Sequence, residues 1–195
     1  VPVVFETSYR KASRYSFYKG INTYSLNNAF FRLNQYAIDN SEKKVQHKKV
    51  VFTTKFAKSG DFEYSFLDGS VFLGAFMNDF ESFRKLKCSL NEEVLDISKA
   101  ETTIHIYNPY QEDIDLDKIR MYASCLNEYK EVMTNVRLSR AKGQSDITRL
   151  KAKDTVSIRY LLPKKPLGDA AYIRLAISEN MLRPGINSRS IKVKK

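Results

Sequence analysis

The sequence predicts an α+β protein that is rich in strands, with antiparallel or mixed sheets and about three helices. Three segments show the spacing of one apolar helix face, whereas many shorter segments alternate apolar and polar residues. The chain has 195 residues and 43% apolar content but only 7 Gly and 5 Pro. It is therefore long enough and apolar enough to bury a substantial core, and a jelly-roll-like sandwich is compatible with the pattern.

Three segments have apolar residues at intervals of three and four, and each follows a residue that can cap a helix. Ser and Asp side chains accept hydrogen bonds from the first free amides of a helix, so they favour helix starts. The expected helices, each with its capping residue, cover 26–39 (Ser25), 72–86 (Ser70) and 116–133 (Asp115). Carboxylates at 112–117 fit a helix start better than a calcium loop, because Lys118 stands where the loop needs glycine.

Strands are expected where β-branched and aromatic residues form short runs. The runs before the third helix cover 3–7, 49–56, 62–67 and 102–107, and four or five more follow residue 133. In the last third, apolar side chains alternate with polar ones, as in Val156, Ile158 and Tyr160 against Ser157 and Arg159. Successive strand side chains point to opposite sides, so one side of these strands is expected to face the core.

Charge is distributed unevenly along the chain. Residues 1–60 hold 11 Lys/Arg and 3 Asp/Glu, residues 61–133 hold 7 and 15, and residues 134–195 hold 15 and 4. No repeat or linker separates these blocks, so we expect a single globular domain over 1–195. Within it we expect a basic, aromatic N-terminal arm at about 1–20 and a basic, strand-rich C-terminal third at 134–195.

The cations of the C-terminal third fall on the side of their strands opposite the apolar residues. If these strands share a sheet, the outer face can neutralise phosphates with Lys and Arg and stack a base on tyrosine. The alternative is an ordinary solvated face, where Lys and Arg also protect strand edges. The residues expected to bind nucleic acid are Arg149, Lys151, Lys153, Arg159, Tyr172, Arg174, Lys192 and Lys194.

No catalytic fingerprint is visible, so we expect no enzyme, no catalytic residue, no cofactor and no metal. Neither His47 nor His105 has a nucleophile or a carboxylate at a motif spacing. A metal-dependent nuclease built on Asp61, Glu63 and Asp68 is the least favoured alternative, because acids are common in turns.

The two cysteines, Cys88 and Cys125, are far apart and are expected to be free thiols in a reducing, cytoplasm-like compartment or in a virion assembled there. The longest apolar run covers only 71–77, so no transmembrane segment is expected. A peripheral contact with anionic lipid is compatible with the charge.

These features favour a non-enzymatic assembly protein of the virion or nucleoprotein kind. We expect it to form homo-oligomers through opposite-sign patches and to contact a polyanion through the basic sheet face. The main alternative is a monomeric or dimeric module that binds nucleic acid without sequence specificity.

Overall fold

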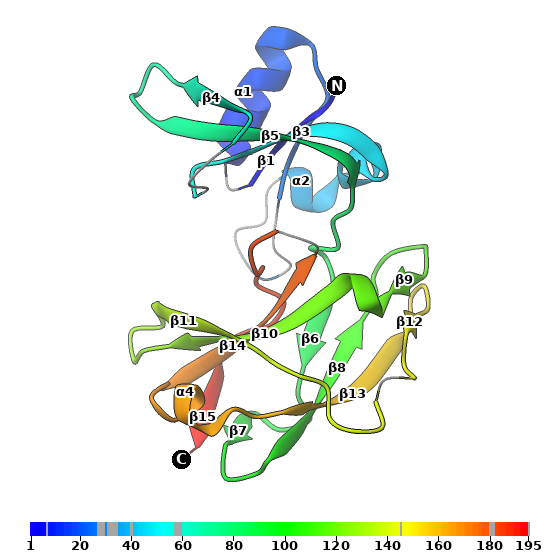
Figure 1. The fold of residues 1–195 in the computed structure, drawn as a ribbon, viewed down its shortest axis with the longest axis vertical. Helices are drawn as coiled ribbons and strands as arrows, with labels where there is room; N and C mark the ends of the chain where they lie inside the picture. The colour runs from blue at the N-terminus through cyan, green and yellow to red at the C-terminus, as the bar shows by residue number, and fades with distance from the viewer. Residues whose placement is uncertain are drawn as a thin grey trace. The chain divides into compact units, whose positions relative to one another are not determined.

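The computed structural model describes residues 1–6, 8–26, 30, 35–39, 41–56, 60–144, 146–179 and 182–194 (Figure 1). The chain divides into two compact units: unit 1 comprises 1–27 and 32–82, and unit 2 comprises 28–31 and 83–195. Strands predominate in both, so the predicted α+β, strand-rich class with mixed and antiparallel sheets is confirmed. The boundary between the units does not follow the charge blocks.

Unit 1 is a mixed five-stranded sheet. β1 runs parallel to β2 and β3, whereas β3 pairs with β5, and β5 with β4, in antiparallel fashion. The strands, in spatial order, are β2 (Thr23–Ser25), β1 (Val3–Phe5), β3 (Lys48–Thr54), β5 (Val71–Phe80) and β4 (Phe62–Ser65).

One long helix, α1 (Tyr9–Lys19), connects the parallel strands β1 and β2, as parallel pairing requires. Ser8 caps its start by accepting from the Lys11 amide, and Gly20 ends it with a left-handed φ of 63°. The Phe5 and Tyr15 rings meet edge to face at 6.0 Å. The first 20 residues thus form β1 and α1 of unit 1, and two short helices follow, α2 (Gln35–Ile38) and α3 (Ser41–Val45).

Unit 2 contains two larger sheets and a two-stranded ladder. The first sheet has the order β11 (Val132–Arg137), β10 (Ile119–Leu126), β14 (Tyr172–Glu179), β15 (Ile191–Lys194) and β7 (Val94–Asp96). The second has the order β13 (Thr155–Leu161), β8 (Glu101–Tyr107) and β6 (Lys87–Ser89), and β12 (Arg149–Leu150) pairs with β9 (Ile114–Asp115). A 3₁₀ turn, η1 (Leu116–Lys118), and a short helix, α4 (Lys164–Gly168), complete the unit.

Inward side chains of the two larger sheets belong to one hydrophobic cluster, so unit 2 is a sandwich. Ile173 and Leu175 of β14 lie in the same cluster as Ile104 of β8 and Ile158 of β13. A jelly roll is built of antiparallel strands. The parallel pairing of β15 with β7 therefore distinguishes this sandwich from the jelly-roll arrangement considered from the sequence.

Two of the three expected helices are wrong. The segment 72–86 contains β5, and the segment 116–133 contains η1, β10 and the first residues of β11. In β5 the apolar residues run almost without interruption, and such a run satisfies helical and strand spacing equally. In the other segment a hairpin turn interrupts the pattern without Gly or Pro, because Lys130 takes the left-handed φ of 63° that such turns require.

The third expected helix, 26–39, is only partly described. Ser25, its expected cap, is the last residue of β2, and residues 35–38 form α2. Residues 27–29 and 31–34 lie outside the described residues. Asp115 does act as a cap, since its carboxylate accepts from the Asp117 amide at 2.9 Å, but it caps η1.

Cys88 and Cys125 are both free and buried, as expected. Burial raises the pKa of both thiols, and the charge of Asp169 adds to the effect at Cys125. A raised pKa suppresses the nucleophilic thiolate, so both groups behave as small apolar core residues. Among the residues that the structure describes, no helix has the length and apolar content needed to cross a membrane.

Candidate functional site

The eight residues expected to bind nucleic acid lie on three different sheets. Arg149 belongs to β12, with Lys151 and Lys153 directly after it, and Arg159 belongs to β13. The other four, Tyr172, Arg174, Lys192 and Lys194, lie on the adjacent strands β14 and β15. The structure therefore brings half of the predicted set together on one sheet.

Acidic side chains and a carbonyl already contact several of these cations. Arg149 lies 3.1 Å from Asp113, and Arg159 lies 3.3 Å from Glu101. The Lys153 ammonium donates to the Pro109 carbonyl at 2.5 Å. Exposed pairs of this kind contribute little stability, but they reduce the charge that a polyanion would meet.

The central group of the site consists of Tyr172, Arg174 and Lys192. Tyr172 stands opposite Lys192 in the β14–β15 pairing, and Arg174 is two residues further along the same face. Ile173 and Leu175 alternate with them and are each 1% exposed, so the three polar side chains lie on the outer face. The predicted alternation is therefore correct over 172–175, whereas Ala176, expected on the same side as Tyr172 and Arg174, is buried.

Two further cations of this region come from the neighbouring strands β10 and β11. Tyr122 stands opposite Arg137 on one side and Ala176 of β14 on the other. Met121, Ala123 and Cys125 are buried, so Arg120 and Tyr122 point to the outer side by alternation. Arg120 and Tyr122 were not predicted because the segment 116–133 was expected to be a helix, and Arg137 was not among the residues expected to bind nucleic acid.

Arg120 and Arg137 also line an open groove of about 590 Å³ at one end of β10 and β11. Arg140 and Lys142 line the same groove, and the acidic residue in its lining is Asp117. The Arg140 guanidinium is held in place, because it donates to the Ile147 carbonyl at 2.9 Å and the Leu116 carbonyl at 3.1 Å. The groove therefore places further cations at this end of β10 and β11.

The carboxylates considered for a nuclease are used in local structure. Asp61 accepts from the Phe76 amide at 2.8 Å, and Asp68 accepts from the Ser70 amide at 3.0 Å. Hydrogen bonds from Ser70, with help from the nearby Lys11, lower the pKa of Asp68 to about 2. Asp61, Glu63 and Asp68 are not brought together as a ligand set within the described residues.

A different set of side chains meets the distance requirement for a metal. Among the described residues, one group of metal-ligand atoms lies within 4.8 Å of one another, and it consists of His47, Asp79 and Glu81 of unit 1. These three residues do not form a metal-binding motif of fixed spacing in the sequence, so nothing in the sequence indicates this group.

No family model matches the chain, and no curated protein matches its sequence. The function is therefore inferred from the chemistry of the surface.

Proposed function

We propose that the protein is a non-enzymatic binding protein that contacts a polyanion, with single-stranded nucleic acid as the class that fits best. The binding surface is the outer side of the first sheet of unit 2, named here the outer basic face. Its residues are Arg120, Tyr122, Arg137, Tyr172, Arg174 and Lys192. The observation that carries the proposal is the placement of two tyrosines among four cations on one face of adjacent strands.

The residue types match the two needs of a nucleic-acid strand. Cations neutralise phosphates and release counterions, whereas an aromatic ring offers a surface on which any base can stack. The Lys130 ammonium lies 5.3 Å from the centre of the Tyr172 ring, which adds a fifth cation at the edge of the face. Since phosphate contacts and stacking carry no base-edge readout, we propose binding without sequence specificity.

A salt titration tests this proposal. We expect Arg174→Ala and Lys192→Ala each to lower the slope of log affinity against log salt by about 0.7, the value per phosphate contact for a single strand. Tyr172→Ala should weaken binding by about 1–3 kcal/mol with little change in that slope, because it removes stacking. The measurement is fluorescence anisotropy of a labelled oligonucleotide of about 16 nucleotides between about 50 and 200 mM salt.

Arg159→Ala is the matched control, because it removes the same charge from the other sheet, where Glu101 already pairs with it. It should leave the slope nearly unchanged. Absence of binding at low salt, or an equal effect of the Arg159 and Arg174 changes, would contradict the proposal.

We also propose that copies of this chain associate through β11. This strand is at the edge of its sheet, and its apolar residues Val132 and Met133 are 55% and 47% exposed, with Tyr129 of the preceding turn 77% exposed. An exposed apolar edge is a template for pairing with another chain. Side-by-side pairing of two β11 strands would join two outer basic faces into one surface and thus link assembly to polyanion binding.

Val132→Lys places a charge on this edge and should shift the protein toward monomer. Sedimentation velocity over a range of concentrations measures the shift, with Lys55→Glu on unit 1 as a change of surface charge away from the edge. A wild-type chain that stays monomeric at every concentration would contradict self-association but leave polyanion binding intact.

A further inference from the structure

A β-bulge in unit 1 sets up a cluster that the proposed function does not use. The register of β3 against β5 changes between Lys48, which faces Phe80, and Val50, which faces Met77. Asn78 and Asp79 of β5 therefore stand opposite the single residue between Lys48 and Val50. A bulge of this kind reorients the side chains beside it and is frequent next to functional sites.

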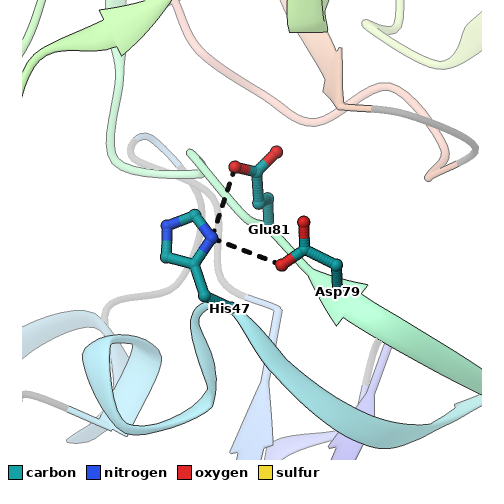
Figure 2. Close-up of side chains that lie close together, drawn as sticks. All are labelled: His47, Asp79 and Glu81. Carbon is teal, nitrogen blue, oxygen red and sulfur yellow. Dashed lines mark hydrogen bonds and ion pairs between the residues drawn. The ribbon is translucent and has the colours of Figure 1, made fainter.

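His47, Asp79 and Glu81 come together directly beyond the bulge. The His47 amide donates to the Phe80 carbonyl at 2.8 Å, which continues the pairing and sets His47 beside Glu81. Asp79 and Glu81 are two residues apart, so their side chains share a face. Figure 2 shows both carboxylates turned toward the same ring nitrogen: His47 Nδ1 lies 3.3 Å from Asp79 Oδ1 and 3.5 Å from Glu81 Oε1.

The backbone around this cluster is held in a defined position. The Gln46 side chain accepts from the Ser82 amide at 2.9 Å and donates to the Ser82 carbonyl at 2.5 Å. This pair of bonds fastens the turn before His47 to the chain just after Glu81. His47 itself takes a left-handed φ of 55°, which is uncommon outside glycine and is maintained only where the surroundings enforce it.

Burial gives the cluster a closed side and an open side. The Glu81 side chain is 6% exposed, whereas those of His47 and Asp79 are 60% and 68% exposed. An ion placed here would meet Glu81 on the protein side and leave a coordination position on the solvent side.

We propose that His47, Asp79 and Glu81 bind a divalent transition-metal ion of the zinc type, with a fourth position open to solvent. Zinc binds imidazole nitrogen and carboxylate oxygen at about 2.0–2.2 Å, and a tetrahedron of such bonds separates its ligand atoms by about 3.4 Å. The separations of His47 Nδ1 from the Asp79 and Glu81 oxygens, 3.3 Å and 3.5 Å, bracket that value. The two carboxylates balance the charge of the ion, and Nδ1 of a neutral imidazole is the third donor.

The ligand set argues against the hard cations. Ca²⁺ takes six to eight oxygen ligands, and Mg²⁺ prefers oxygen in octahedral geometry with several waters. An imidazole among three protein ligands favours zinc and its neighbours in the transition series. The competing assignment for the same geometry is a protonated histidine paired with two carboxylates, and the experiment must separate the two.

The experiment uses the full chain, freed of metal with a chelator and titrated with Zn²⁺ while histidine side chains are followed by ¹H–¹⁵N NMR. The chain has two histidines, so His105 in unit 2 is an internal reference. We expect one Zn²⁺ per chain by calorimetry, a change in the His47 ring signals, unchanged His105 signals, and no response to Mg²⁺. A chain that binds no Zn²⁺, or that shifts His105 instead, would overturn the site in favour of a plain ion pair.

Two variants and one control complete the test. His47→Gly removes the imidazole and accepts the left-handed φ without strain, and Asp79→Asn removes one charge at nearly constant size. Each should weaken Zn²⁺ binding by at least about 100-fold, since even groups behind metal ligands cost 10–100-fold. Glu63→Gln, an exposed acid on β4 of the same unit, should bind as the wild type does.

The thermal midpoint provides a second readout that does not require a spectrum of each variant. Zn²⁺ bound to the folded chain should raise the midpoint of the wild type and of the Glu63 variant, and the rise should grow with the logarithm of the Zn²⁺ concentration above the dissociation constant. The His47 and Asp79 variants should show no such rise. Equal rises in all four proteins would mean adventitious binding only and would overturn the proposal.

Discussion

Glu179→Ala is expected to lower the free energy of unfolding by about 3–5 kcal/mol, the cost of removing one partner of a buried ion pair. Arg84 and Glu179 are 4% and 1% exposed, and Arg84 Nε lies 3.3 Å from Glu179 Oε2. The second carboxylate oxygen accepts from the Phe83 amide at 2.6 Å, and the guanidinium donates to the Arg183 carbonyl at 2.8 Å. Without Glu179, Arg84 would be a buried charge with no counterion among the residues that the structure describes.

Urea unfolding followed by circular dichroism measures this loss of stability. Two further variants test whether the loss comes from the unpaired charge of Arg84. Glu128→Ala removes an exposed acid of the same unit and should change stability by less than about 0.5 kcal/mol. The double change Arg84→Met with Glu179→Leu should recover most of the loss, because apolar replacements of both partners remove the isolated charge. A single Glu179 variant as stable as the Glu128 variant would show that the pair is not buried in solution.

Strands were predicted best from the sequence where one face of the strand is buried and the other is exposed to solvent. In β13, Ile158 and Tyr160 are 0% and 4% exposed, while Arg159 between them is exposed, which is the alternation predicted for this strand. In β5 and β10 the apolar residues crowd both sides, and helical spacing can then be found in a strand. Local spacing cannot decide such segments, because the outcome depends on which strands lie beside them.

The same limit applies to the outer basic face. Tyr172, Arg174 and Lys192 could be predicted because apolar and polar residues alternate at the start of β14 and along β15, and the two strands are close in the chain. Arg149 and Arg159 carry the same signal, but pairing with β9 and β8 places them on other sheets beside Asp113 and Glu101. Alternation predicts which side of a single strand is exposed to solvent. Only the pairing of strands decides which of these exposed sides form one common face.

The group formed by His47, Asp79 and Glu81 could not be predicted from the sequence, because it also depends on strand pairing. His47 and Asp79 are 32 residues apart and meet through the β3–β5 pairing, and the bulge that sets the final register has no sequence signature. The carboxylates that looked clustered in the sequence, Asp61 and Asp68, bind backbone amides of their own hairpin. Acidic side chains near turns often accept hydrogen bonds from backbone amides of the turn. Acidic residues that are close in the sequence therefore do not reliably form a metal-ligand set.

Asn187→Ala is expected to lower the free energy of unfolding by about 3 kcal/mol, since it leaves one buried donor and one buried acceptor without partners at about 1–3 kcal/mol each. Asn187 is 0% exposed. Its side-chain oxygen accepts from the Ile177 amide at 2.7 Å, and its amide nitrogen donates to the Leu86 carbonyl at 2.8 Å. Ile177 lies on β14, and Leu86 directly precedes β6, so one side chain joins chain segments of both sheets of the sandwich.

The backbone hydrogen bonds of Asn187 do not involve its side chain, so the substitution tests the side-chain amide and not the local strand pairing. Its backbone amide donates to the Leu175 carbonyl at 3.0 Å, and its backbone carbonyl accepts from the Cys88 amide at 2.6 Å. We expect both bonds to remain in the alanine variant, because neither uses the side chain. Asn91→Ala, at an exposed position of the same unit, is the control and should be nearly neutral. Asn187→Asp keeps the acceptor but sets a carboxylate against the Leu86 carbonyl, so it should destabilise at least as much as alanine at neutral pH. A stable aspartate variant would mean that water reaches this position and that the two sheets do not depend on the amide.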